Sequence, residues 1–421
     1  MALIIEKLSA LEILDSRGRP TVLARCRLAG GAAAAASVPS GASTGSSEML
    51  ELRDGDLRRY RGLGCRKAVA NINETVNAAL AGRTFADQAT LDRMLLELDG
   101  TANKSRLGAN ALLGVSLAFA RAAAQQFGVP LYEHAAGLLG VTPGSLPRPM
   151  INLFSGGKHA GNQVPLQDVL IIPVAAPTFS DALVVMFEIY QCAADLAASK
   201  YGMRMLRADE GGLAPPFADA DAMLGDAVTA IRSAGFQPGR EVCLAVDVAA
   251  SHFYRGGKYF CGPKSLDSAG MIEQIARWVR QYPIVSVEDG LAEDDWGYWP
   301  VLRERLAGTA TVIGDDLLCT NPVRISRAVQ VRAADALLLK VNQIGTLTEA
   351  MEACQLARAA GWRVVVSARS GETEDDWLAD LAVGWGAEQI KVGSITQSDR
   401  LSKYNRLLAI EAETGLALAE L

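Results

Sequence analysis

Short apolar runs that each end in a polar residue recur through the second half of the chain. The run LAVD ends in Asp247, IVSVE in Glu288, TVIGD in Asp315 and ALLLK in Lys340. Runs rich in Val, Ile and Leu between turn-forming residues are typical of buried parallel strands. The pattern therefore predicts a parallel sheet whose strands carry polar residues at their carboxyl ends.

Helical patterns between these runs predict that the sheet closes into a barrel. Two of them cover 271–282 and 346–361, and two further apolar runs end in Ser367 and Lys391. A strand and helix that repeat about every 25 residues are expected to form a (β/α) barrel, with the active site at the carboxyl ends of the strands. Three carboxylates and two lysines would then share one mouth. Three acids suit a divalent cation such as Mg²⁺, and a nearby lysine is a candidate base.

The first part of the chain has a different pattern, which predicts a separate α+β domain over residues 1–137. Gly and Pro are frequent at 140–149, which reads as a linker, and the barrel domain is expected over 138–421. In the first domain we expect strands at 3–8, 21–28 and leading into 37–40, and helices at 66–81, 87–98 and 109–127.

Composition narrows the classes of partner. The net charge of −6 gives no general basic surface, so we expect neither nucleic acid nor membrane as a partner. The seven cysteines are scattered and form no CxxC pair, which indicates reduced thiols and a cytoplasmic protein. No stretch is expected to reach the apolar length of a membrane span, and the N-terminus lacks a signal-peptide pattern.

Four polar loops add candidate binding groups. The loop SVPSGASTG (37–45) allows close backbone approach and offers hydroxyl ligands, and ADEGG places Glu210 in a tight turn. Arg369 and Ser370 follow a strand and precede a helix, which favours an anion site. His159 lies in a glycine-rich loop. Taken singly, each also fits a surface turn, a solvated acid or a surface ion pair.

Together these segments resemble enolase, and the resemblance runs nearly from end to end. It is carried by DSRGRPTV (15–22), SVPSGASTG (37–45), LDGTANKSRLGANALLGVSLA (98–118), DEGG (209–212), PIVSVED (283–289), AEDDW (292–296), ADALLLKVNQIGTL (334–347) and RSGETED (369–375). The resemblance implies an α/β fold with an enolase-type (β/α)8 barrel whose second strand is antiparallel, and an N-terminal α+β capping domain. It also implies a homodimer and two Mg²⁺ ions per active site.

The resemblance assigns a role to each matching residue. Metal ligands would be Asp247, Glu288 and Asp315, with Ser43 at the second ion. Lys340 matches the general base and Glu210 the general acid. Substrate would contact Arg369, Ser370, Lys391 and Gln167, while His159 and Asp168 join the catalytic loops. Lys340 must be partly neutral to act as a base, so we expect burial and nearby cations to lower its pKa. Glu210 must carry a proton, so we expect a desolvated or like-charged setting.

The chain departs from the enolase pattern at four positions. Ala368 replaces a histidine, Asp168 replaces a glutamate, and Gly290 and Leu291 replace Pro-Phe. In the family, the lost histidine and glutamate lie on the side of the leaving hydroxyl. Shortening that carboxylate moves it by about 1 Å, which can cost on the order of a hundredfold in rate. We therefore expect enolate chemistry to survive and dehydration to be impaired or replaced.

These observations predict a divergent, Mg-dependent enolase-like enzyme. Its substrate would resemble 2-phosphoglycerate or phosphoenolpyruvate, a small phosphorylated or phosphonylated carboxylic acid. Altered chemistry at the enol oxygen would fit carboxyphosphonoenolpyruvate synthesis in a phosphonate or phosphinate natural-product pathway. Two alternatives stay open: an ordinary phosphopyruvate hydratase, and a non-catalytic binding protein on an enolase scaffold.

Overall fold

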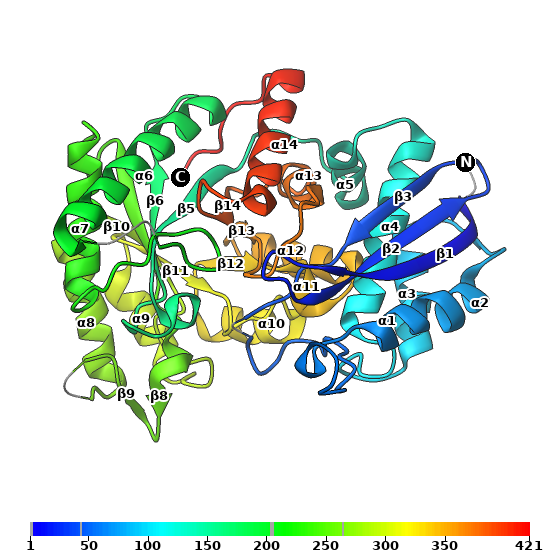
Figure 1. The fold of residues 1–421 in the computed structure, drawn as a ribbon, viewed down its shortest axis with the longest axis horizontal. Coiled ribbons are helices and arrows are strands. Elements are labelled where there is room, and N and C mark those ends of the chain that lie inside the picture. Colours follow the sequence, from blue (N-terminus) through cyan, green and yellow to red (C-terminus); the bar gives the residue numbers. More distant parts are fainter. Residues whose placement is uncertain (1–2, 43, 203–205, 263–264) are drawn as a thin grey trace.

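The computed structural model describes residues 3–42, 44–202, 206–262 and 265–421. The chain forms a small α+β region that carries the N-terminus and a larger barrel that includes the C-terminus (Figure 1). Ser43, a predicted metal ligand, lies outside the described residues.

The N-terminal region is an antiparallel sheet covered by helices. Its strand order is β3-β2-β1-β4. The strands are β1 (Leu3–Leu14), β2 (Pro20–Leu28), β3 (Ala33–Ser37) and β4 (Thr84–Phe85). The helices are η1 (Tyr60–Gly62), α1 (Arg66–Ala70), η2 (Asn71–Val76), α2 (Asn77–Leu80), α3 (Gln88–Asp99), α4 (Ala109–Phe127) and α5 (Leu131–Leu139). Strand β1 runs past the predicted end at residue 8, because it pairs with β2 as far as Leu14.

The second region is a closed barrel of eight strands in the order β10-β11-β12-β13-β14-β5-β6-β7. These are β5 (Arg148–Ser155), β6 (Asp168–Pro173), β7 (Val242–Asp247), β10 (Ile284–Glu288), β11 (Thr311–Gly314), β12 (Ala336–Leu339), β13 (Arg363–Ser367) and β14 (Gln389–Gly393). Strand β6 is antiparallel to both neighbours and the other pairs are parallel. The predicted fold class, including the antiparallel second strand, is confirmed.

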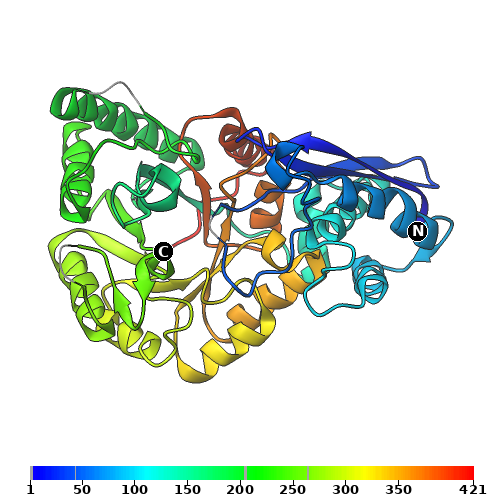
Figure 2. The same ribbon diagram turned by 60° about the horizontal axis from the view of Figure 1, so that its bottom comes forward.

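Helices surround the barrel, as Figure 2 shows from a second direction. They are α6 (Phe179–Tyr201), α7 (Ala220–Ser233), α8 (Ser268–Gln281), α9 (Trp299–Leu306), α10 (Pro322–Val331), α11 (Val341–Ile344), α12 (Leu347–Ala359), α13 (Trp377–Gly384) and α14 (Ser398–Thr414). Short 3₁₀ turns, η3 (Gly157–Ala160) and η4 (Ala250–Phe253), and a hairpin of β8 (Tyr254–Arg255) and β9 (Lys258–Tyr259) complete it. Many of these helices begin at a side-chain cap. Asp219, Asp267 and Thr346, for example, accept hydrogen bonds from backbone N–H groups of the first turn.

Helix α6 corrects one expectation from the sequence. By length and composition it is the one helix among the described residues that could cross a membrane, although no stretch was expected to qualify. It packs against β5, β6, α7 and α14, and its Phe179, Met186 and Ile189 are fully buried. A core helix of a soluble protein passes the same test, so this helix is weak evidence for a membrane span.

The alternation of side chains along each barrel strand sets the position of the candidate site. Ala245, Ile313 and Val365 belong to an apolar cluster inside the barrel, whereas their sequence neighbours join the outer core. Residues two positions further along therefore also point inward, at the C-terminal mouth of the barrel. On β7 and β11 those residues are Asp247 and Asp315.

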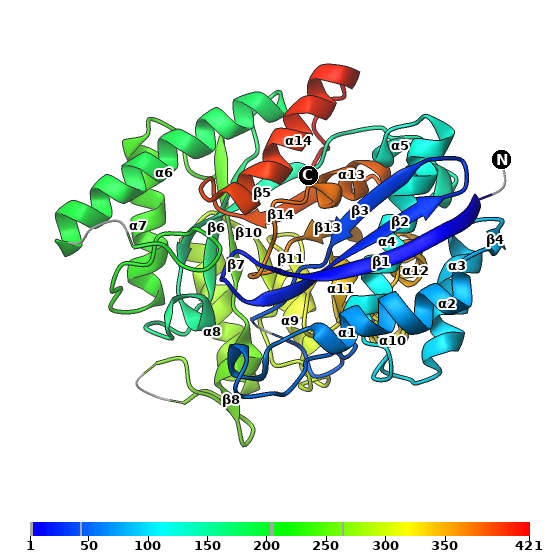
Figure 3. The same ribbon diagram turned by 45° about the vertical axis from the view of Figure 1, so that its right-hand side comes forward.

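The N-terminal region closes against this mouth (Figure 3). Helix α5 packs on α13, where Gly384 allows the close approach, since a Cβ atom there would lie 2.4 Å from the carbonyl oxygen of Tyr132. Ser40 and Gly371 form an antiparallel bridge between the two regions. The loop that begins at residue 37 is thereby held beside the ends of the barrel strands.

Candidate active site

A small cavity lies at the C-terminal mouth of the barrel. Its walls are His159, Gln167, Glu210, Asp247, Lys340, Ser367, Ala368, Arg369, Ser370 and Lys391. About 20 Å³ of it is open to a water molecule, which is room for roughly one. The polar side chains fill the mouth, so a substrate must displace contacts that they now make with one another.

Two lysines pair with the predicted metal carboxylates. Lys391 Nζ lies 2.9 Å from Asp247 Oδ2 and 2.7 Å from Glu288 Oε2. Lys340 Nζ contacts Asp315 Oδ2 in the same way. The register that pairs Asp247 with Glu288 on adjacent strands brings the first two acids together.

The electrostatics of this cluster favour added positive charge. Burial and the neighbouring Asp247 raise the pKa of Glu288 well above its usual value, although Lys391 opposes this. Burial would lower the pKa of Lys391, but Asp247 and Glu288 outweigh it and raise that pKa strongly. Burial and the repulsion between the carboxylates thus raise the pKa of Glu288, whereas attraction to the same carboxylates raises that of Lys391.

The pKa of Lys340 corrects a second expectation. Burial does lower it, as predicted, but the attraction of Asp315 is larger in combination with Glu288, and the net pKa is raised. The sequence pattern did not reveal that this lysine pairs with a predicted metal ligand. A cation bound to Asp315 would compete with that pairing and lower the pKa of the amine.

A second acidic group lies beside the first and was missed in the sequence. The carboxylate of Asp289 accepts hydrogen bonds from the backbone N–H groups of Asp315 (3.0 Å) and Asp316 (2.7 Å). Asp289 has a positive φ of 44°, and burial beside Asp316 raises its pKa well above normal. Burial and Asp315 raise the pKa of Asp316 to about 8. A signal for both acids is present in the sequence: Asp289 directly follows Glu288, and Asp316 directly follows Asp315.

These donors fit a hard divalent cation. In the described part of the chain, two groups of three have ligand atoms within 4.8 Å of one another: Asp289, Asp315 and Asp316, and His159, Asp168 and Glu210. The predicted trio is not one of them, because Asp247 and Glu288 meet at Lys391 and Asp315 at Lys340. Carboxylate oxygens suit Mg²⁺. Held by Asp247, Glu288 and Asp315, Mg²⁺ would supply positive charge for an enolate.

The group formed by His159, Asp168 and Glu210 is held together by ion pairs between its own side chains. His159 Nδ1 lies 2.9 Å from Asp168 Oδ2, and His159 Nε2 lies 3.7 Å from Glu210 Oε1. Burial disfavours the imidazolium, but Glu210 and Asp168 outweigh it and raise the pKa of His159 to about 9. Without a metal ion the three side chains therefore form an ion-paired network.

Glu210 differs from its expected protonation state. Burial raises its pKa, but His159, Arg400 and Lys391 outweigh burial and lower the net value below normal. Asn152 Nδ2 also donates to Glu210 Oε2 at 2.9 Å. The carboxylate is therefore ionised, and the proton expected on Glu210 resides on His159 instead.

Arg369 and Ser370 form the anion-binding side of the cavity together with the N-terminal region. Arg369 Nη1 lies 3.0 Å from Glu48 Oε2 and from Asn342 Oδ1. Ser370 Oγ accepts from the backbone N–H of Ala42 at 2.7 Å. A contact such as Arg369 with Glu48 joins residues more than 300 positions apart, so no local sequence signal could have revealed it.

The four departures from the family pattern fall into two places. Ala368 lines the cavity, where its methyl group replaces a ring. Asp168 does not line it, because its carboxylate is held by His159 and, at 2.5 Å, by the hydroxyl of Ser155. Gly290 and Leu291 lie in the core, and a Cβ atom on Gly290 would meet Leu302 at 2.9 Å. Two departures thus change the site, and two change the packing beside it.

The closed barrel, the antiparallel second strand and a mouth lined by acids and lysines define a barrel enzyme of the enolase superfamily. Comparison with protein-family models agrees with this class. The model described as "Enolase, N-terminal domain" matches residues 5–135, and "Enolase, C-terminal TIM barrel domain" matches residues 143–419. The chain therefore belongs to the enolase family.

Proposed function

We propose that this protein is a divergent, Mg²⁺-dependent enolase-like enzyme that acts on a substrate of the 2-phosphoglycerate or phosphoenolpyruvate type with altered chemistry at the enol oxygen. One observation carries the proposal. The cavity wall has two lysines, the carboxylate of Asp247 and the arginine Arg369, whereas Ala368 is in the wall where the family has a histidine, and Asp168 is bound to His159 and does not line the cavity.

The retained groups support formation or binding of an enolate. A proton beside a carboxylate is weakly acidic, because its removal leaves two negative charges on one small group. Lys391 and the divalent cations would stabilise that charge as it develops, and Lys340 would accept the proton. Arg369 and Ser370 would hold the phosphate, with Glu48 giving up its contact to the guanidinium.

The changed groups argue against efficient dehydration. The leaving hydroxide needs an acid at a defined distance, and Asp168 is shorter than glutamate and already bound to His159 and Ser155. Ala368 leaves space and offers no proton. His159, whose pKa is about 9, is the protonated group left on this side.

A transfer reaction at the enol oxygen fits this distribution. The site would hold phosphoenolpyruvate through its carboxylate beside an activated carboxyphosphonate. The enol oxygen would bond to the phosphorus of the carboxyphosphonyl group as the bond to the donor's leaving group breaks, and the phosphoryl group of phosphoenolpyruvate would pass to that leaving group. Such a reaction yields carboxyphosphonoenolpyruvate, as in phosphonate and phosphinate natural-product pathways. The space beside Ala368 would accommodate the larger group. We further propose a homodimer in the cytoplasm with two Mg²⁺ ions per site and no nucleic-acid or membrane partner.

The test is a paired assay of dehydration and transfer. The protein is incubated with 2-phosphoglycerate and Mg²⁺ while enol absorbance is followed, and a parallel mass-spectrometric screen pairs phosphoenolpyruvate with phosphonates and activated phosphonates. We expect slow or absent dehydration and a new enol ester of a phosphonate. Turnover at ordinary enolase rates would instead establish a phosphopyruvate hydratase.

Metal titration separates both enzymes from a silent scaffold. Burying several acids with two lysines is costly, and a protein without chemistry has no physical need for it. We expect saturable Mg²⁺ binding by calorimetry. A chain that binds no Mg²⁺ and turns over none of these substrates would be a non-catalytic member of the family.

A further inference from the structure

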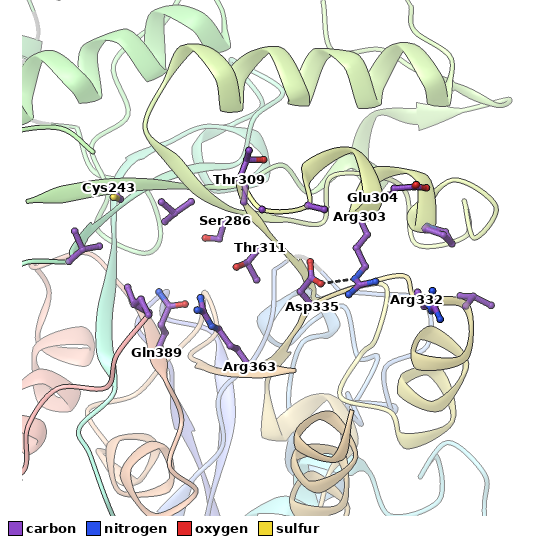
Figure 4. A pocket seen from close by; sticks show the side chains of 18 residues that line it. Cys243, Ser286, Arg303, Glu304, Thr309, Thr311, Arg332, Asp335, Arg363 and Gln389 are labelled. Carbon is purple, nitrogen blue, oxygen red and sulfur yellow. Dashed lines mark hydrogen bonds and ion pairs between the residues drawn. The ribbon is translucent and has the colours of Figure 1, made fainter. Parts of the chain in front are cut away.

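A large cavity lies at the opposite, N-terminal mouth of the barrel. Its volume is about 930 Å³, within the range of roughly 300–1,000 Å³ that small-molecule sites occupy. Figure 4 shows Ser286, Thr311, Arg363 and Gln389 around one space. None of these residues belongs to the candidate active site described above.

The residues that face this cavity are unusual for the floor of a barrel. Thr311 and Arg363 stand two positions before Ile313 and Val365 of the inner apolar cluster, so they also point inward. The layers inside such barrels are normally filled by branched apolar side chains. Here the lowest layer is polar, and it surrounds open space instead of packed atoms.

These polar groups lack partners. The hydroxyl of Ser286 is buried and has no hydrogen-bond partner. Within the described ranges, the side chains of Arg363, Gln389 and Thr311 make no hydrogen bond or ion pair either. A buried or half-buried polar group without a partner is costly, so the arrangement favours a ligand that supplies one.

The charges around the cavity select an anion. Its wall holds the side chains of three arginines and two acids, Asp335 and Glu304, together with the last residue, Leu421. Asp335 Oδ1 accepts from Arg303 Nε at 2.6 Å and its Oδ2 from the backbone N–H of Val312, so this acid is already used. Glu304 is exposed at the rim. Among the described residues the guanidinium of Arg363 makes no ion pair, and its planar fork suits a carboxylate or a phosphate.

We propose that this cavity binds a small organic anion, whose carboxylate or phosphate is held by the guanidinium of Arg363. Ser286, Thr311 and Gln389 supply further hydrogen bonds to the head group. Val174 and Val285 give an apolar wall for the body of the ligand. The site is separate from the proposed catalytic function and does not depend on it.

Calorimetric titration with three matched probes tests the proposal. Benzoate carries a carboxylate, phenyl phosphate carries a phosphate, and benzyl alcohol carries the same ring without charge. We expect at least one anion to bind saturably, and benzyl alcohol to bind at least tenfold more weakly. The anion that binds more tightly identifies the head group. Equal binding of benzyl alcohol, or no saturable binding by either anion, would overturn the proposal.

Substitution separates this site from the anion-binding arginine of the other mouth. Arg363→Gln should weaken anion binding at this site at least tenfold, because it removes the charge and leaves Arg369 intact. The matched control is Arg255→Gln on the β8–β9 hairpin, which should leave the titration unchanged. Ser286→Val provides a second variant that narrows the cavity and should also weaken binding. Superimposable titrations for the parent protein, Arg363→Gln and Ser286→Val would place the bound anion elsewhere and refute the assignment.

Discussion

The same barrel strands carry polar residues into both mouths of the barrel. The two mouths differ in how these residues are paired and in how much open space surrounds them. Strand β11 begins with Thr311 and is followed directly by Asp315, and strand β14 begins with Gln389 and carries Lys391. At the C-terminal mouth the charged groups pair with one another and leave room for about one water molecule. At the N-terminal mouth a cavity of about 930 Å³ is lined by Ser286, Thr311, Arg363 and Gln389, whose side chains have no hydrogen-bond partner among the described residues.

This difference shows that the size of a cavity alone does not identify the catalytic site. The smaller mouth concentrates acids, lysines and a charged histidine whose pKa values are strongly displaced, which is typical of catalytic sites. The larger mouth has space and two guanidinium groups, those of Arg332 and Arg363, that form no ion pair within the described ranges, which is typical of binding without reaction. Variants that act at one mouth and spare the other therefore test the assignment.

The largest effect is expected from Lys340→Ala. Removing the base should lower deuterium exchange at C2 of 2-phosphoglycerate by about 10²–10⁴-fold, because the second amine of the cavity, Lys391, is held by Asp247 and Glu288. Proton NMR in D₂O measures this rate. Arg332→Ala, at the N-terminal mouth, should leave the exchange rate unchanged, and an equal loss in both variants would contradict the separation of the two mouths.

Metal binding should depend on one mouth only. Glu288→Gln removes a carboxylate charge that meets Asp247 at Lys391, so we expect Mg²⁺ affinity to fall by about a hundredfold. Isothermal titration calorimetry gives the affinity. Glu304→Gln is the matched change at the other mouth and should bind Mg²⁺ as the parent protein does. Unaltered affinity in Glu288→Gln would remove this residue from the metal site.

Stability should fall as pH rises through the pKa of His159. The folded-state pKa is about 9 and the ordinary value is 6.5, so the stabilisation is complete below pH 6.5 and lost as pH rises through 9. The loss should be on the order of 3 kcal/mol. Urea unfolding at pH 6.5 and 9.5 measures it. His159→Gln should flatten this dependence, whereas His134→Gln should keep it, because burial lowers the pKa of His134.

The smallest effects separate a paired hydroxyl from an unpaired one. Ser155→Ala removes the donor to Asp168 and should destabilise the fold by about 1–3 kcal/mol. Ser286→Ala removes a hydroxyl without a partner, so its free energy of unfolding should stay within about 1 kcal/mol of the parent value or rise. Urea unfolding compares the two. A large loss in Ser286→Ala would show that this hydroxyl has an important structural partner.

The sequence predicted the barrel well because its signals are local. Apolar runs that end at Asp247, Glu288 and Lys340 give both the strands and the mouth at which their ends meet. The protonation states could not be predicted in this way. They depend on pairs such as Lys340 with Asp315 and His159 with Glu210, which tertiary packing alone brings together. The polar floor at Ser286 and Arg363 was missed because a polar residue at the start of a strand looks like an ordinary loop boundary.

The most direct test follows 2-phosphoglycerate with Mg²⁺ in D₂O by NMR and compares two rates, deuterium entry at C2 and loss of the hydroxyl group. If Lys340 abstracts the proton and the groups beside the leaving hydroxyl no longer assist its departure, deuterium should enter at C2 at least tenfold faster than water is lost. Ala368→His should bring the two rates closer together. Dehydration that keeps pace with exchange in the unaltered protein would contradict the account.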